Sequence, residues 1–263
     1  MPKGKATPLT VQHDQGTAFL LDQARRHDSD RYLCALLAPA DRRAALIALT
    51  VFNHELARVP KVTSQPLAGM IRLQWWRDVI DELVRGASSR HHPVVESLAE
   101  ALAKGRVSPH SLHALIDARE PALDRPAPDP VRLEAYAAGT SGELARIWYA
   151  ALGGTASNEA DGASAMGTAF GLVGLERALG DEASHLAADT ESHEVTAVTA
   201  AIRQRAKALV AEGRRLAGRP SRGCMAAFLL GALVDDRLRR PDGRGRSPLA
   251  PLTLAARVLL RRP

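Results

Sequence analysis

Proline recurs directly behind helix-capping residues along this chain, and this placement constrains the fold more than any other feature. Proline has no backbone N–H, so it is tolerated in the first turn of a helix and disrupts a helix interior. Four such pairs occur: Ser64 with Pro66, Ser108 with Pro109, Asp129 with Pro130, and Ser247 with Pro248. We therefore predict that a helix begins at each of these places.

Apolar residues recur at helical spacing between these starts. Two stripes show the pattern: Leu73, Trp76, Ile80 and Leu83, and Ala45, Leu49, Phe52 and Leu56. Ala and Leu dominate, and runs of β-branched residues are scarce, which favours helix over strand. The predicted fold class is all-α, with helices near 15–28, 41–58, 66–85, 93–104, 109–119, 130–153, 161–179, 194–217, 221–239 and 248–261.

The length and composition favour one large domain. The chain has 263 residues, 46% of them apolar, and no predicted loop is long enough for a domain linker. We expect a flexible N-terminal tail over 1–14, a helical domain over 15–240, and a basic C-terminal helix and tail over 241–263. Cys34 and Cys224 lie in apolar helical stretches, which favours reduced, buried thiols.

The chain is basic, and much of the excess charge lies near its two ends. Thirty-five Lys and Arg against 29 Asp and Glu give a net charge of +6. Basic ends suit an anionic surface, although solvated tails are the commoner explanation. No recognition motif accompanies the charge, so we expect no nucleic-acid binding. Without a leader or a run of about 18 apolar residues, a cytoplasmic protein is expected, with peripheral contact at the inner membrane as an open alternative.

Four stretches rise above the helical background and together carry a family resemblance. They are Asp30 to Arg58, Arg72-Leu73-Gln74-Trp75-Trp76-Arg77-Asp78, Tyr136 to Gly142, and Gly167 to Glu182. The second is the most specific, because two adjacent tryptophans inside a charged helix are rare by chance. Over roughly residues 15–240 the stretches resemble the squalene/phytoene synthase family, which joins two prenyl diphosphates head to head.

Within that family the chain most resembles a degenerate branch. The branch contains a mitochondrial respiratory complex I assembly factor with a phytoene-synthase-like domain, together with its bacterial relatives. The residues from Phe52 to Arg58 and the double tryptophan carry this resemblance. It implies a multi-helix bundle of the isoprenoid-synthase type, with any site between the helices.

The family's chemistry requires carboxylates that this chain lacks at the first motif. Aspartates four residues apart project from one helix face, so two facing pairs can hold Mg²⁺ against a substrate diphosphate. By resemblance, the first motif falls on Ala57, Arg58 and Lys61, where the active enzymes carry acids. An apolar residue and two cations therefore replace the acids.

The second motif is also altered. Gly171 and Gly174 stand where the active enzymes carry polar amides, and Ala178 replaces the leading aspartate. Only Asp181 and Glu182, at the far end of the motif, remain acidic. Metal-dependent ionisation of a prenyl diphosphate is therefore not expected.

Candidate ligand-binding residues come from the four stretches. They are Arg31, Tyr32, Asn53, Arg58, Lys61, Arg72, Gln74, Trp75, Arg77, Tyr136 and Arg177, the last matching the second motif. The fork of Arg58 suits phosphate, so Arg58 and Lys61 could hold an anionic headgroup without metal, although a solvated helix end is an equal alternative. Core packing is the favoured role for Trp76.

These observations lead to one leading hypothesis and two alternatives. We expect a non-catalytic assembly or binding factor without a cofactor, with respiratory complex I subunits or assembly factors as partners. The first alternative is an active head-to-head prenyltransferase that holds Mg²⁺ with the non-standard acids Glu55, Asp78, Asp181 and Glu182. The second is an isoprenoid or lipid carrier that keeps an apolar cavity and discards the chemistry.

Overall fold

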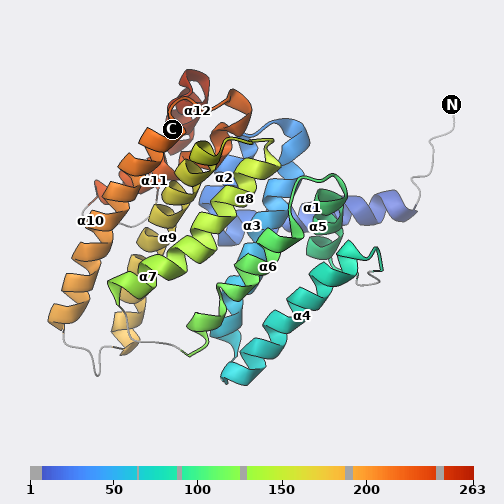
Figure 1. Ribbon diagram of the computed structural model, residues 1–263, viewed down its shortest axis with the longest axis horizontal. Helices are drawn as coiled ribbons and strands as arrows, with labels where there is room; N and C mark the ends of the chain where they lie inside the picture. Colours follow the sequence, from blue (N-terminus) through green and yellow to red (C-terminus); the bar gives the residue numbers. More distant parts are fainter. Residues whose placement is uncertain (1–7, 64, 88–90, 125–128, 187–191, 241–245) are drawn as a thin grey trace.

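The computed structural model describes the backbone of residues 8–63, 65–87, 91–124, 129–186, 192–240 and 246–263. Side chains are described over the same ranges, except for residues 8–14, 180–186 and 192–195. Every regular element in the described ranges is a helix (Figure 1). The predicted all-α fold class is confirmed.

The α-helices follow one another with short connections. They are α1 (Pro8–His27), α2 (Ser29–Leu36), α3 (Ala40–Val62), α4 (Pro66–Val84), α5 (Pro93–Ala103), α6 (Pro109–Asp117), α7 (Pro130–Ala137), α8 (Glu143–Ala151), α9 (Ser157–Leu186), α10 (Ser192–Ala217), α11 (Leu229–Leu238) and α12 (Ala250–Leu260). Two 3₁₀ turns, η1 (Glu120–Ala122) and η3 (Arg222–Phe228), and one π-helical turn, η2 (Ala138–Gly142), complete the set.

Proline marks three of the four predicted helix starts; the fourth pair, Ser247 with Pro248, lies in a turn, and α12 begins at Ala250. The helices α4, α5, α6 and α7 begin at Pro66, Pro93, Pro109 and Pro130. At the start of α7, the Asp129 carboxylate accepts a hydrogen bond of 2.9 Å from the backbone N–H of Arg132. The cap and the proline therefore act together to fix this helix end.

Several boundaries differ from the sequence prediction, and the helix expected over 221–239 begins with the 3₁₀ turn η3 before α11. Helix α1 already begins at Pro8, inside the stretch expected to be a tail over 1–14. Helix α2 was not predicted; it starts directly after α1 because the Asp28 side chain caps the backbone N–H of Arg31 at 3.0 Å. The helix expected over 130–153 is interrupted by the π-helical turn η2.

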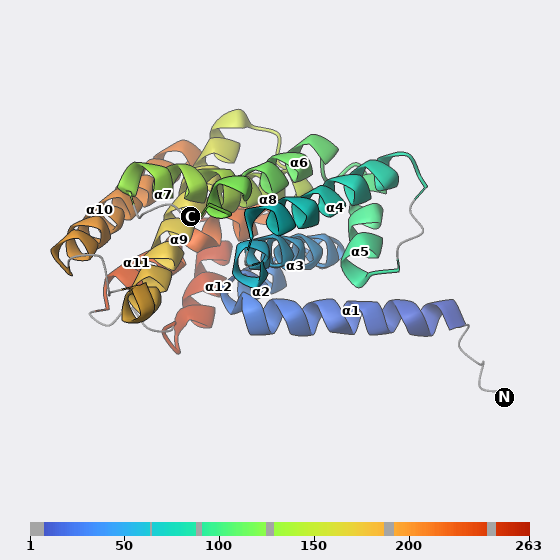
Figure 2. The same cartoon turned by 90° about the horizontal axis from the view of Figure 1, so that it is seen from below.

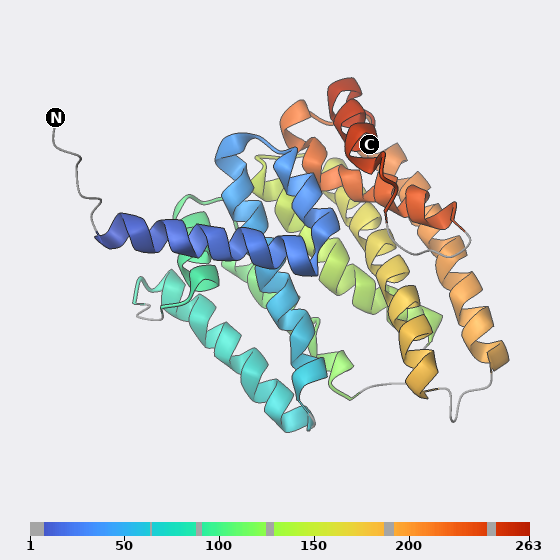
Figure 3. The same ribbon diagram turned by 180° about the vertical axis from the view of Figure 1, so that it is seen from behind.

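Two helices organise the core. Helix α3 buries Leu46, Leu49, Phe52 and Leu56 completely and packs against α1, α2, α4, α5 and α8. Helix α9 packs against α7, α8, α10, α11 and η2. Figures 1 and 3 place α4 and α10 at opposite edges of the bundle, and Figures 2 and 3 show α1 lying across one face. No helix in the described residues is long and apolar enough to cross a membrane.

Glycines allow α9 to approach the π-helical turn closely. A Cβ at Gly167 would lie 2.5 Å from the carbonyl oxygen of Ser141, and one at Gly171 would lie 2.7 Å from the Ser141 Cβ. Only glycine fits such distances without displacing the backbone. This close crossing fixes Ser141 between α9 and α2. Local π-helical turns often occur at functional sites.

Candidate functional site

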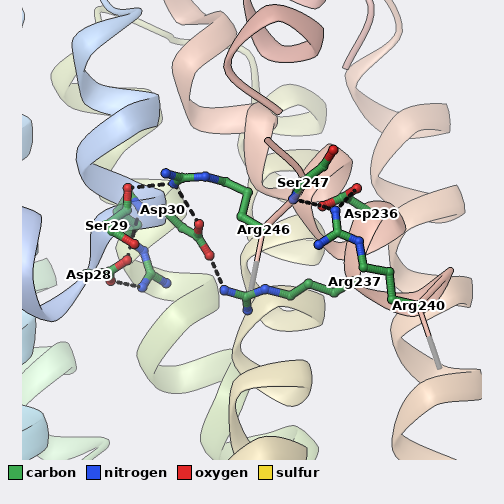
Figure 4. Close-up of polar contacts among 9 residues, drawn as sticks. Asp28, Ser29, Asp30, Asp236, Arg237, Arg240, Arg246 and Ser247 are labelled. Atoms are coloured by element: carbon green, nitrogen blue, oxygen red, sulfur yellow. Dashed lines mark hydrogen bonds and ion pairs between the residues drawn. The ribbon is translucent and has the colours of Figure 1, made fainter. Parts of the chain in front are cut away.

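A buried carboxylate at the start of α2 joins three parts of the chain. Asp30 is 5% exposed and forms ion pairs with Arg237 of α11 and with Arg246, which precedes α12 (Figure 4). The Arg246 Nη1 lies 3.0 Å from the Asp30 Oδ1 and donates a second hydrogen bond of 3.0 Å to the Ser29 carbonyl. The C-terminal elements are thereby tied to α2.

Arg31, in the same turn, extends this polar cluster toward α9. Its guanidinium donates to Asp28 at 2.6 Å and to the Ser141 Oγ at 2.5 Å. The Ser141 hydroxyl donates in turn to the Gly167 carbonyl at 2.6 Å. We call these residues, with Asp30, Arg237 and Arg246, the Asp30 cluster. It connects α2, η2, α9 and α11 through charge-assisted hydrogen bonds.

Burial shapes the electrostatics of the Asp30 cluster. Desolvation lowers the pKa of Arg237, with the Asp30 carboxylate opposing the shift. The Arg31 and Arg237 guanidinium groups lie 4.8 and 4.7 Å from the centre of the Phe170 ring, which adds cation–π attraction. Burial, followed by the charges of Asp30 and Asp28, raises the pKa of the Cys34 thiol. That thiol is therefore protonated at neutral pH and is not a nucleophile.

A cavity of about 420 Å³ opens beside the Asp30 cluster. Its lining consists of Ser29, Asp30, Arg177, Arg237, Arg246, Ser247, Pro248 and Pro251. Three arginines face one carboxylate there, so the lining is net positive. Arg177 forms no ion pair with any other side chain that the structure describes. The cavity therefore suits an anionic group.

A second hollow lies between α3 and α4. This α3/α4 groove has a volume of about 250 Å³ and is lined by Glu55, Arg58, Val59, Val62, Arg72, Trp75, Trp76 and His92. Arg58 donates to Glu55 at 3.2 Å, and both side chains contact solvent. Trp76 is core, as predicted, and meets the Phe52 ring edge to face at 5.1 Å, whereas Trp75 is 39% exposed.

A buried arginine connects α3 to α7. Arg119 donates to the Asn53 Oδ1 at 2.6 Å and to the Tyr136 hydroxyl at 2.7 Å. Its Nε is buried without a hydrogen-bond partner among the described atoms. Asn53 and Tyr136, both predicted to bind a ligand, are thus held by a residue that the sequence did not single out.

The predicted ligand-binding residues divide among separate places. Arg58, Arg72 and Trp75 line the α3/α4 groove, Asn53 and Tyr136 bind Arg119, and Arg31 and Arg177 lie near Asp30. The remaining four lie elsewhere: Gln74 donates to Asp78, Arg77 pairs with Asp117 and Glu120, Lys61 is exposed at the end of α3, and Tyr32 packs against the core. The structure does not bring them to one common point. Their role in ligand binding stays a prediction.

The described residues do not fit the Mg²⁺ cage that the family implies. Mg²⁺ takes oxygen ligands in octahedral geometry. At the first-motif positions, Ala57 is half-buried while Arg58 and Lys61 are exposed cations. No group of three or more His, Cys, Asp or Glu side chains in the described part of the chain is placed to hold a metal. The side chains of Asp181 and Glu182 lie outside the described residues.

Comparison with known proteins identifies the family and supports the fold. The family model for squalene/phytoene synthase matches residues 24–187, more than half of the chain. The chain belongs to the squalene/phytoene synthase family. Two solved structures show the same fold. A dehydrosqualene synthase in complex with ligand has a TM-score of 0.73 and 14% identity, and the match covers 95% of this chain and 97% of that one. The squalene synthase HpnC from Alicyclobacillus acidocaldarius has a TM-score of 0.68 and 15% identity, and the match covers 95% of this chain and 96% of that one.

The curated relatives of this family member are complex I assembly proteins. NADH dehydrogenase (ubiquinone) complex I, assembly factor 6 is 33% identical in Bos taurus and 32% in Homo sapiens, each over 161 residues, or 61% of this chain and 48% of the relative. The Drosophila melanogaster homolog is 28% identical over 185 residues, which is 68% of this chain and 55% of that homolog. The matches thus span about half the length of these relatives. The predicted family and branch are confirmed.

Sequence reasoning missed several residues of the Asp30 cluster. Arg237 and Arg246 counted only as part of the basic C-terminal charge, yet both pair with Asp30. Nothing local signals such pairs, because the partners are 207 and 216 residues apart. Ser141 had a weak signal, since it lies between two glycines of a recognised stretch.

Proposed function

We propose that this chain is a non-catalytic assembly factor for respiratory complex I that uses the squalene/phytoene synthase fold as a binding scaffold. The names of the relatives support the assembly role, with complex I subunits or other assembly factors as partners. Because the matches cover about half of those relatives, the proposal concerns this domain. The proposed absence of catalysis rests on the residues that stand at the two family motifs.

The observation that carries the proposal is the chemistry at the first motif. Ala57, Arg58 and Lys61 supply no oxygen ligand, and the two cations would repel Mg²⁺. Removing one preorganised charge-stabilising group commonly costs about 2.7–4 kcal/mol in the transition state, so losing several costs on the order of 10⁴-fold or more in rate. Diphosphate ionisation at this site is therefore lost.

The second motif supports the same conclusion. Active members of the family need polar side chains on this helix, but Gly171 faces Ser141 and Ala137, whose Cβ atoms lie 2.7 and 3.1 Å from where its own Cβ would be. Helix packing occupies the space that an amide side chain would need. The middle of α9 therefore packs closely at Gly171, whereas a Cβ at Gly174 would meet nothing within 4 Å.

The alternative of an active prenyltransferase has less support. Its described candidate acids already have partners on their own helices, because Glu55 accepts from Arg58 and Asp78 accepts from Gln74. An isoprenoid or lipid carrier remains a second candidate. The three arginines that line the cavity beside Arg177 suit an anionic headgroup, but the lining of this cavity is not the apolar surface that the rest of a lipid or isoprenoid would need.

Deletion of the gene in the organism that encodes it tests the proposal. We expect loss of NADH:ubiquinone oxidoreductase activity and accumulation of complex I subassemblies on native gels, both restored by the wild-type gene. Carotenoid and hopanoid content should not change. Intact complex I together with loss of a carotenoid or hopanoid would contradict the assembly role and favour the prenyltransferase.

A further inference from the structure

Large apolar side chains lie exposed along the first three turns of α4. Leu67 is 68% exposed and Ile71 is 64% exposed, and Trp75 continues the same row at four-residue spacing. Met70 and Val62, the latter at the end of α3, are also exposed. Clusters of large exposed apolar residues on a soluble domain commonly mark an interaction surface.

The row occupies the outer side of its helix. Gly69, Leu73 and Trp76 bury the opposite side of α4 against the bundle. Figures 1 and 3 show α4 at the edge of the molecule. The exposed residues thus lie at an edge, and the neighbouring α3/α4 groove is lined half by polar or charged side chains and half by valines and tryptophans.

Cations surround this apolar row. Arg58 and Arg72 line the adjoining groove, and Lys61 is exposed in the last turn of α3. Neither Lys61 nor Arg72 forms an ion pair with another residue that the structure describes. Glu55 is the acid in the groove lining, and Arg58 already pairs with it. This end of the surface is therefore net positive.

The charge changes sign farther along α4. Asp78 and Asp81 follow the apolar turns, and their carboxylates bind Gln74 and His113. An anionic surface would attract the start of α4 and repel its later turns. The charge pattern thus selects both a partner and an orientation.

We propose that Val62, Leu67, Met70, Ile71 and Trp75, rimmed by the three cations, form a binding face for a membrane that contains anionic phospholipids. An exposed apolar row with a Trp and a basic rim is the pattern of an interfacial membrane contact. The side chains would enter the boundary between headgroups and acyl chains, while the cations remain at the phosphates. This inference does not depend on the assembly role.

Trp75 provides a built-in reporter for this contact. Trp76 and Trp148 are already buried, so their surroundings would not change on binding. A blue shift of tryptophan emission in the presence of vesicles would therefore come from Trp75. The shift should disappear in Trp75→Phe.

The test uses the full chain with vesicles of phosphatidylcholine alone or mixed with phosphatidylglycerol. We expect cosedimentation with the anionic vesicles, weakened by salt, and little with phosphatidylcholine alone. Leu67→Ser/Ile71→Ser should lower the partition coefficient about tenfold or more. Arg72→Gln should lower it about fivefold. Because these side chains are exposed, the variants should fold normally. Circular dichroism spectra and thermal midpoints that match the wild type check this.

A matched control comes from α12. Leu252 and Leu259 are as exposed as Leu67 and Ile71, so Leu252→Ser/Leu259→Ser removes a similar area elsewhere. This control variant should bind vesicles like the wild type. The inference is overturned if the wild-type chain stays in the supernatant, if the α4 variant binds normally, or if both double variants lose binding equally. The inference is also overturned if a protein partner binds to α4 and the chain does not bind vesicles.

Discussion

The Asp30 cluster and the α3/α4 groove contain similar charged groups in opposite surroundings. In the cluster, one buried carboxylate pairs with Arg237 and Arg246, and these contacts hold α2, α11 and the segment before α12 together. In the groove, Arg58 and Arg72 contact solvent beside an exposed tryptophan. Buried charges here serve the fold, whereas exposed ones are available to a partner.

The largest expected effect comes from removing the shared carboxylate. Asp30→Ala leaves Arg237 buried without its counter-charge, and breaking such a pair costs about 3–5 kcal/mol. Chemical denaturation measures the loss. The matched control is Asp41→Ala, which removes the pairs of an exposed carboxylate with Arg42 and Arg106 and should cost no more than about 1 kcal/mol. Equal losses in the two variants would show that the Asp30 cluster does not hold the helices together.

The next effect separates two glycines of α9. Gly171→Asn forces a Cβ against Ser141 and Ala137 and should destabilise the protein by about 1–3 kcal/mol. Gly174→Asn is its control, because nothing lies within 4 Å of a Cβ at that position. Its unfolding free energy should stay within about 0.5 kcal/mol of the wild type. If both variants are equally stable, α9 and η2 are not packed as described.

A smaller effect concerns acid stability where the end of α1 meets the second half of α3. The His54 ring stacks on His27 at 4.2 Å, and burial, followed by the charge of His27, lowers the pKa of His54. The unfolded chain then binds the proton more readily, so the unfolding free energy should fall as the pH drops below about 6.5 and level off once it passes the lowered pKa. Urea titrations at several pH values measure this slope. His54→Gln should flatten it, and parallel slopes would contradict the assignment.

The smallest effect is expected in the groove. Arg58→Ala breaks an exposed pair with Glu55 and should change the unfolding free energy by less than about 0.5 kcal/mol. Thermal denaturation with the wild type alongside is sufficient to measure it. A loss as large as that of Asp30→Ala would mean that the groove also holds the fold together, and the contrast between the two regions would fail.

The sequence predicted those parts of the fold that depend on local chemistry. Pro93 and Pro109 mark helix starts because the missing N–H acts within a single turn. Helix α2 was missed because its cap, Asp28, follows α1 without a loop to announce a new helix. Short-range signals therefore located most helices but not every break between them.

The site was less predictable because it depends on long-range contacts. The sequence identified Arg31 and Asn53 as candidates, but their partners Ser141 and Arg119 lie 110 and 66 residues away. By resemblance, Gly171 was predicted to stand where active members of the family carry an amide; the packing against Ser141 leaves no space for a side chain at this position. Which polar residues meet is decided by tertiary packing, which the local pattern does not contain.

The most direct measurement is release of inorganic diphosphate from farnesyl diphosphate by the purified chain in Mg²⁺, with an active squalene synthase as the positive control. Since Ala57, Arg58 and Lys61 supply no metal ligand, release should match that of a sample without protein. Mg²⁺-dependent release with formation of a head-to-head product would contradict the non-catalytic assignment.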